Sequence, residues 1–175
     1  MNISNISNIS QAKKEVVITL EQLRNTIIEN HKRADQPASG LTIATMRIEE
    51  TETGARLLGR RAFATLETGR KPGNVPQNFT AIIKQWIIDK GIPFEHKPYI
   101  RQPSDKWQPK YTPEERGLNS LASAIAWNIE KHGTKLYREG GRKDIFTEPI
   151  DKVIPELKKK LAVIFKTEIE RIQRL

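Results

Sequence analysis

Apolar residues recur at the spacing of one helix face in four segments of this chain, and this periodicity restricts its fold more than any other feature. Each such helix must bury its apolar face against another element. The apolar positions are Leu20, Leu23, Ile27 and Ile28; Phe79, Ile82, Ile83, Trp86 and Ile87; Leu118, Leu121, Ala122, Ile125 and Ile129; and Leu157, Leu161, Ile164, Phe165, Ile169 and Ile172.

Capping and breaking residues predict where these helices begin and end. Thr112 is followed by Pro113 and by Glu115, the signature of a capping box, so the third helix begins there with the most distinct signal. The last helix is expected from about Ile150 to the C-terminus, and Pro155 either starts it or kinks it. The first helix is expected to begin at Thr19 as its N-cap and to end before Pro37. Gly91 should end the second helix, and Gly133 should end the third.

Between the first two helices the period changes to that of strands. Residues 41–48 alternate as a strand, Thr53 and Gly54 form a turn candidate, and residues 55–67 return as a second strand. The expected fold is therefore α+β: a small antiparallel β-sheet packed against several helices, with a long C-terminal helix.

The remaining segments predict the domain organisation. Three copies of Asn-Ile-Ser occupy residues 2–10, so we expect residues 1–15 to be a flexible N-terminal arm. Residues 16–175 are long enough for a single α+β domain. Within that domain, residues 93–112 contain four prolines and read as a long irregular loop. Trp86 lies in the apolar stripe of its helix and is expected in the core.

Composition narrows the classes of partner. The charge balance, 30 − 21 = +9 with a pI near 9.8, favours contacts with DNA or with acidic protein surfaces. The absence of cysteine excludes disulfides and thiolate metal sites. No apolar run reaches the ~20 residues of a membrane span, and residues 1–11 lack the features of a signal peptide, so we expect no membrane contact and a soluble compartment.

Residues that could carry chemistry do not converge on an enzyme. His31, His96 and His132 are far apart in the sequence, and no serine has the glycine context of a nucleophile. We therefore expect no catalytic residues, no metal and no cofactor. A nuclease-like metal site remains as a minor hypothesis; it would use Glu49, Glu50, Glu52, Glu67 and Lys71.

Aromatic and basic side chains in loops are the candidate interface residues. Aromatics on polar segments often anchor protein partners, and basic glycine loops can contact phosphate backbones or acidic side chains. The candidates are Tyr99, Trp107 and Tyr111 in the long loop, Arg70 and Lys71 in the first glycine loop, and Arg142 and Lys143 in the second.

Five short motifs in order carry a resemblance to a known family. A helix precedes the strands, and residues 66–72, Leu-Glu-Thr-Gly-Arg-Lys-Pro, loosely match a Glu-x-Gly-Thr-Gly stretch. The phrases that follow are Trp-Ile-Ile-Asp-Lys-Gly-Ile at 86–92, Ala-Ile-Ala-Trp-Asn-Ile-Glu-Lys-His-Gly-Thr at 124–134, and Phe-Thr-Glu-Pro-Ile at 146–150. In this order, from about Leu41 to the C-terminus, the chain resembles the tail-completion, or head–tail joining (neck), proteins of tailed bacteriophages.

The resemblance implies a structural virion protein of the neck or upper tail. Such a protein would form a ring of its own copies around the DNA channel and join the head connector to the tail. Its partners would be portal, connector or tail proteins, and its basic residues would face either DNA in the channel or an acidic neighbouring protein. It would occupy the host cytoplasm during assembly and the virion afterwards. The alternative, from charge alone, is a sequence-independent DNA-binding protein with a basic surface.

Overall fold

The chain forms two compact units in a computed structural model that describes residues 3–100, 102, 104, 106 and 108–173. Unit 1 combines residues 1–67 with 142–175, and unit 2 consists of residues 68–141. We expected one domain over residues 16–175. The chain crosses between the units near Glu67 and near Arg142, at the two basic glycine loops.

Unit 1 begins with helix α1, which spans Ile3–Arg33. The helix passes through Thr19 without interruption, so the prediction of an N-cap at Thr19 was wrong. Residues 3–15, which we expected in a flexible arm, form its first turns. Asn, Ser and Ile favour helix only weakly, but Ala12 is already buried, and packing of this kind overrides local propensity.

A short helix and a β-hairpin follow α1. Gly40, with φ of +73°, leads into helix α2 (Leu41–Ala44), and only then does strand β1 (Arg47–Glu50) start. Strand β2 (Ala55–Leu58) pairs antiparallel with β1, with Arg47 opposite Leu58 and Glu50 opposite Ala55. The predicted strands over 41–48 and 55–67 were therefore both too long. The left-handed Gly40 and the break at Gly59, before the next helical turns, shorten them.

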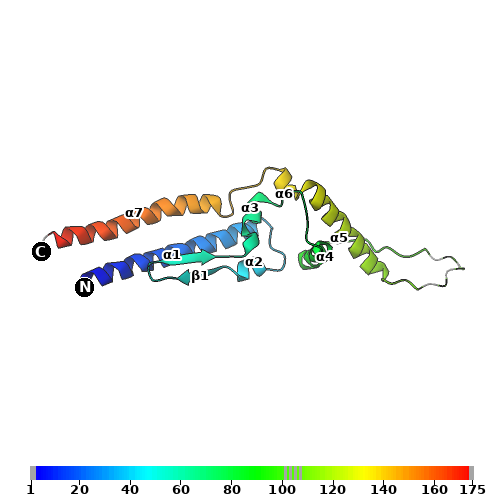
Figure 1. The fold of residues 1–175 in the computed structure, drawn as a ribbon, viewed down its shortest axis with the longest axis horizontal. Coiled ribbons are helices and arrows are strands. Elements are labelled where there is room, and N and C mark those ends of the chain that lie inside the picture. Colours follow the sequence, from blue (N-terminus) through cyan, green and yellow to red (C-terminus); the bar gives the residue numbers. More distant parts are fainter. Residues whose placement is uncertain (1–2, 101, 103, 105, 107, 174–175) are drawn as a thin grey trace. The chain divides into compact units, whose positions relative to one another are not determined.

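The chain then enters the 3₁₀-helix η1 (Arg61–Ala64) and helix α3 (Thr65–Thr68), and after unit 2 it returns into helix α7 (Thr147–Ile172). Pro155 lies inside α7 instead of starting it. α1 contacts α7 and both strands, and α1 and α7 run side by side with the N-terminal end of α1 near the C-terminal end of α7 (Figure 1). The core of unit 1 consists of Leu23, Ile27, Met46 and Ile145.

Unit 2 is built on two helices, α4 (Phe79–Lys90) and α5 (Pro113–His132), followed by the short helix α6 (Lys135–Arg138). Both long helices match the prediction. Gly91 ends α4 in the left-handed conformation, and the side chains and backbones of Thr112 and Glu115 form the expected capping box. The helices pack on each other through Ile83, Ile87, Ala122 and Ala126.

The position of Trp86 differs from the prediction. Ile87 is fully buried, whereas Trp86 is 37% exposed, and Ile82, one turn earlier, is exposed as well. Because α5 is the one long helix that covers α4 within unit 2, only the central part of the apolar stripe of α4 is buried. Together, the two units make a mostly helical α+β protein with a two-stranded antiparallel sheet and a long C-terminal helix.

Candidate interaction surface

Arg70 holds the first glycine loop in place. Its backbone N–H donates to Oγ1 of Thr134 at 2.9 Å, and its carbonyl accepts from the N–H of Thr134 at 2.9 Å. Nη2 of Arg70 donates to the carbonyl of Asn74 at 2.7 Å, and the guanidinium lies over the ring of Phe79. The residue that we expected at an interface is thus engaged inside unit 2, and Lys71 is the exposed cation of this loop.

Gly69, at the start of this loop, is required because the backbone of α6 lies very close to it. Gly69 has φ of +66°, and a Cβ atom there would lie 2.5 Å from the backbone nitrogen of Tyr137. Any other residue would collide with the start of α6. The glycine therefore serves the packing of the loop, and no phosphate site needs to be invoked for it.

The second glycine loop carries Arg142 and Lys143, which belong to unit 1. Nε and Nη2 of Arg142 donate to the two carboxylate oxygens of Asp144 at 2.7 and 2.6 Å. The hydrogen bond with Asp144 raises the pKa of Arg142, and the bond with Arg142 lowers the pKa of Asp144. Lys143 is exposed. The two basic loops thus lie in different units, and each keeps one exposed lysine.

The long loop between α4 and α5 contains the aromatic candidates. Tyr99 is half-buried and stacks on Arg116 of α5, with 3.6 Å between the guanidinium carbon and the ring centroid. Tyr111 is exposed and lies beside Lys110. Trp107 lies outside the described residues. Of the two that the structure describes, Tyr111 has the more exposed ring and is the better candidate for contact with a partner.

The carboxylates of the nuclease hypothesis do not share one environment. Glu49, Glu50 and Glu52 are exposed on the hairpin, and Glu50 pairs with Lys13 of α1 at 3.1 Å. Glu67 is buried and its carboxylate accepts hydrogen bonds at the start of α7. Among the described residues, no group of three or more His, Asp or Glu side chains is placed to hold a metal ion.

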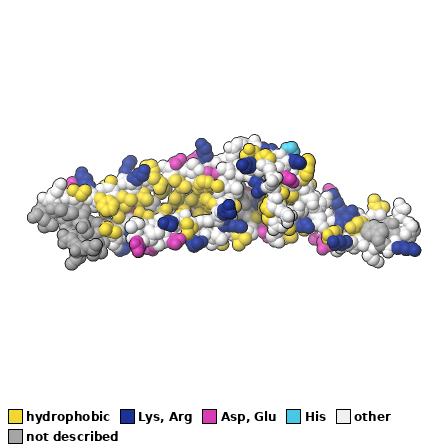
Figure 2. All heavy atoms as spheres, viewed as in Figure 1, with side chains coloured by type: hydrophobic (Ala, Val, Ile, Leu, Met, Phe, Trp, Pro, Cys, Tyr) yellow, Lys and Arg dark blue, Asp and Glu magenta, His cyan; other side chains and the backbone are white. Residues whose placement is uncertain are grey.

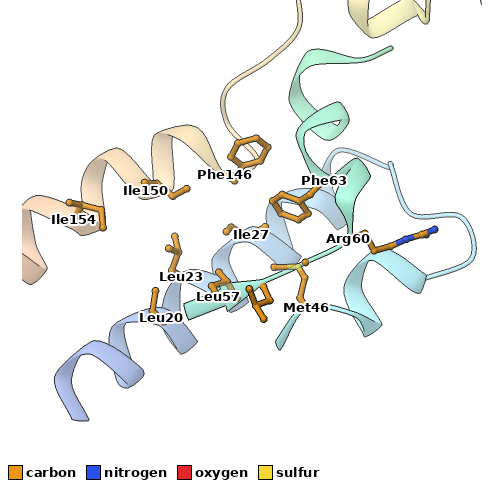
Figure 3. A pocket seen from close by; sticks show the side chains of 12 residues that line it. Leu20, Leu23, Ile27, Met46, Leu57, Arg60, Phe63, Phe146, Ile150 and Ile154 are labelled. Atoms are coloured by element: carbon orange, nitrogen blue, oxygen red, sulfur yellow. The ribbon is translucent and has the colours of Figure 1, made fainter. Parts of the chain in front are cut away.

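Unit 1 has an apolar groove that was not predicted from the sequence. Its volume is about 390 Å³, and α1, the hairpin and α7 form its walls. Ile150 and Ile154 of α7 line it opposite Leu20 and Leu23 of α1, and Phe63 and Phe146 close one end (Figure 3). We call this the unit 1 groove; it is lined by Leu20, Leu23, Ile27, Met46, Leu57, Leu58, Gly59, Arg60, Phe63, Phe146, Ile150 and Ile154.

The apolar surface of α7 extends beyond this groove. We predicted one apolar side for this helix, but the structure divides it into a covered and an open part. Leu157, Leu161 and Ile164 are half-buried, whereas Phe165 and Ile169 are 45% and 56% exposed. Figure 2 shows hydrophobic side chains gathered at the surface of unit 1 along α1 and α7. The width of the apolar stripe of α7 could have indicated in the sequence that part of it stays exposed. A single partner helix covers only a narrow part of such a stripe.

Unit 2 also has large apolar side chains that are exposed to solvent. Besides Trp86, Trp127 of α5 is 58% exposed, and its ring meets the ring of His132 edge-on, with 6.1 Å between centroids. Ile82 and Ile88 of α4 are exposed on either side of the α4–α5 contact. Both units therefore have a small core and a larger set of uncovered apolar residues.

Comparisons with protein-family models, with curated proteins and with solved structures found no match for this chain. Within the part of the chain that the structure describes, no helix combines the length and the apolarity needed to cross a membrane.

Proposed function

We propose that this chain is a structural protein of the neck or upper tail of a tailed bacteriophage, where its copies form a ring around the DNA channel and join the head connector to the tail. Its partners would be further copies of itself and portal, connector or tail proteins. It would act in the virion, after assembly in the host cytoplasm. The resemblance in the order of its motifs is the first support for this proposal.

The observation that carries the proposal is the amount of apolar surface that both units leave uncovered. Exposed contiguous apolar residues in a folded chain mark surfaces that other proteins cover. In unit 1 the large exposed apolar residues include Ile150, Ile154, Phe165 and Ile169 of α7, and in unit 2 they include Trp86 and Trp127. A ring subunit has two such surfaces, because each copy contacts one neighbour on each side.

Three polar side chains named as candidates are engaged in structural contacts, which also favours an assembly role. The carboxylate of Glu67 accepts hydrogen bonds at the start of α7, and the guanidinium of Arg142 binds Asp144. The guanidinium of Arg70 donates to the carbonyl of Asn74 in its own loop. Exposed cations such as Lys71 and Lys143 remain available for DNA in the channel or for an acidic neighbouring protein.

Quantitative mass spectrometry of purified phage particles from the source of this sequence tests the proposal. A ring component should appear at a low, fixed ratio to the capsid protein, and imaging of the particles should then place it at the neck or upper tail. Absence from intact particles would contradict the proposal.

The alternative, a sequence-independent DNA-binding protein, predicts a different result. Binding of a labelled DNA duplex should then be strong at low salt and should weaken steeply as salt rises, because phosphate contacts release counterions. A virion component whose basic residues face protein should show weak duplex binding at physiological salt while still being present in particles.

A further inference from the structure

We propose that one end of unit 2 binds the phosphate backbone of duplex DNA, independently of base sequence. We call this end the basic corner; it consists of the first glycine loop, residues 68–74, and of residues 130–141, which contain the end of α5 and α6. The inference rests on the proposed function, because it names the surface that each copy would turn toward the DNA in the channel. It concerns unit 2 alone.

Backbone hydrogen bonds bring these two distant segments together. The N–H of Thr134 donates to the carbonyl of Arg70 at 2.9 Å, and the N–H of Gly73 donates to the carbonyl of Glu130, also at 2.9 Å. Lys71 lies between these two anchored positions of the loop. The backbone therefore holds Lys71 beside the end of α5, and its ammonium group takes no part in this attachment.

Cations outnumber carboxylates in the basic corner. Its two segments contain five Lys or Arg residues and two Glu residues, a net charge of 5 − 2 = +3. Residues 75–83 and 117–129, which connect the corner to the rest of α4 and α5, contain no charged residue. The excess is less concentrated elsewhere, with seven basic and five acidic residues in 84–116 and 18 and 14 in unit 1. The charged residues of the corner are Arg70, Lys71, Lys131, Lys135 and Arg138, with Glu130 and Glu139.

Three cations of the corner point into solvent. Lys71 and Lys131 are exposed, and neither forms an ion pair with any described residue. Arg138 is exposed as well, and its guanidinium makes a long hydrogen bond, 3.4 Å, to the carbonyl of Gly133. These side chains can therefore contact an anion without breaking an ion pair within unit 2.

The two carboxylates of the corner do not neutralise these cations. Glu139 pairs with Lys135 at 3.7 Å, and the half-buried Glu130 can offset at most one of the remaining positive charges. Tyr137, which is 44% exposed, and the exposed Asn74 add neutral hydrogen-bond donors. Proteins use hydroxyl and amide groups of this kind, as well as cations, to bind phosphate oxygens.

A DNA duplex matches these features better than a second copy of the chain. The duplex carries one negative charge per about 1.7 Å of its axis, so cations on separate segments can each meet a phosphate. Such contacts carry no information about the bases, and the binding is therefore independent of sequence. A second copy has a net charge of +9 and would be repelled. An acidic protein of another kind is the alternative that the experiment must separate.

Removal of two lysines tests this site. Fluorescence anisotropy of a short labelled duplex measures its Kd for the full chain between about 50 and 200 mM salt. Lys71→Gln/Lys131→Gln should weaken binding at least about fivefold at the lowest salt and should lower the slope of log K against log salt by about two. The loss should be the same for two duplexes of different sequence.

Two variants serve as matched controls. Lys71→Arg/Lys131→Arg keeps both positive charges and should bind like the wild type. Lys14→Gln/Lys32→Gln removes two exposed lysines of α1 in unit 1, so it has the same change in net charge, and it should keep the wild-type slope. Circular dichroism checks that all variants keep their helices.

Three results would overturn the inference. They are a wild-type chain that does not bind the duplex at about 50 mM salt, an unchanged slope in Lys71→Gln/Lys131→Gln, and an equal loss in the unit 1 control. Loss of polyglutamate binding in Lys71→Gln/Lys131→Gln without loss of duplex binding would assign the corner to an acidic protein instead. The proposed function fails on a different observation, the absence of the chain from phage particles.

Discussion

The buried side chain of Glu67 in α3 binds Thr147, the first residue of α7. Oε1 of Glu67 accepts the backbone N–H of Thr147 at 2.9 Å, and Oε2 accepts the hydroxyl of the same residue. Oε1 also accepts the N–H of Phe146 at 2.7 Å. The first N–H groups of a helix have no partner inside the helix, so this carboxylate caps α7 from a distant part of the sequence.

Replacing Glu67 with Ala should destabilise the protein by about 3 kcal/mol, because it leaves buried donors without an acceptor. Glu67→Gln should cost less, since its amide oxygen can still accept from the backbone. Urea unfolding followed by circular dichroism measures both, and Glu49→Ala, on the exposed hairpin, is the matched control. Equal stability of Glu67→Ala and this control would contradict the capping role.

The contact between Glu67 and Thr147 also shows which kind of interaction could not be predicted from the sequence. Local signals located α4 and α5 well, because Gly91 and the Thr112–Glu115 capping box act within one helical turn. The cap of α7 depends on a carboxylate 80 residues away in sequence, and no local pattern reports such a pairing. We had placed Glu67 near a hypothetical metal site instead.

Which apolar residues of a helix are exposed could not be predicted from the sequence either. Periodicity identified the apolar faces of α4 and α7, but which part of each face is covered depends on the neighbouring helix. Ile87 and Trp86 are adjacent in the sequence and differ from complete burial to 37% exposure. For the same reason, the candidate interface residues of the loops were predicted individually, whereas the unit 1 groove was missed.

Ile87 and Trp86 therefore have different expected costs. Ile87→Ala should destabilise the protein by about 2–5 kcal/mol by leaving a cavity in the core of unit 2. Trp86→Ala should cost clearly less than the ~3–5 kcal/mol typical of a buried tryptophan. Thermal or urea unfolding of both variants makes the comparison. A larger loss for Trp86→Ala would mean that the face of α4 is assigned incorrectly.

Gly117 of α5 should not tolerate a side chain. A Cβ atom there would lie only 2.0 Å from the carbonyl oxygen of Glu95, where the long loop crosses the helix. Gly117→Ala should therefore destabilise unit 2 by about 1–3 kcal/mol, even though alanine favours helix. Hydrogen exchange should show faster exchange at the N–H of Lys97, which bonds to the carbonyl of Pro113. Gly54→Ala, with open space around the site, is the control.

Thr19 offers the opposite case, a substitution that should stabilise the protein. It is 5% exposed, and its hydroxyl has no hydrogen-bond partner among the described residues. Thr19→Val removes the desolvation penalty with a side chain of similar shape, and about 1 kcal/mol of added stability is expected. Thr26→Val is the matched control, because the Thr26 hydroxyl is exposed and bonds to the carbonyl of Gln22. A loss of stability in Thr19→Val would contradict this placement.

The ion pair of Asp144 and Arg142 should make a small part of the stability depend on pH. The hydrogen bond with Arg142 lowers the pKa of Asp144 below its ordinary value of 3.8. The carboxylate is therefore favoured in the folded state, and its contribution is fully present above the ordinary pKa and is lost as the pH falls through the folded pKa. Because the side chain of Asp144 is 51% exposed, Asp144→Asn should cost less than about 1 kcal/mol at neutral pH.

The free-energy difference between the wild type and Asp144→Asn should shrink toward zero as the pH falls through the lowered pKa of Asp144, because both side chains are uncharged below it. High salt at neutral pH should reduce it as well. Urea unfolding at several pH values gives this difference directly, and Asp151→Asn, at an exposed position of α7, should show a smaller effect at each pH. A difference that grows on acidification would mean that Arg142 does not stabilise the ionised form of Asp144 in the folded protein.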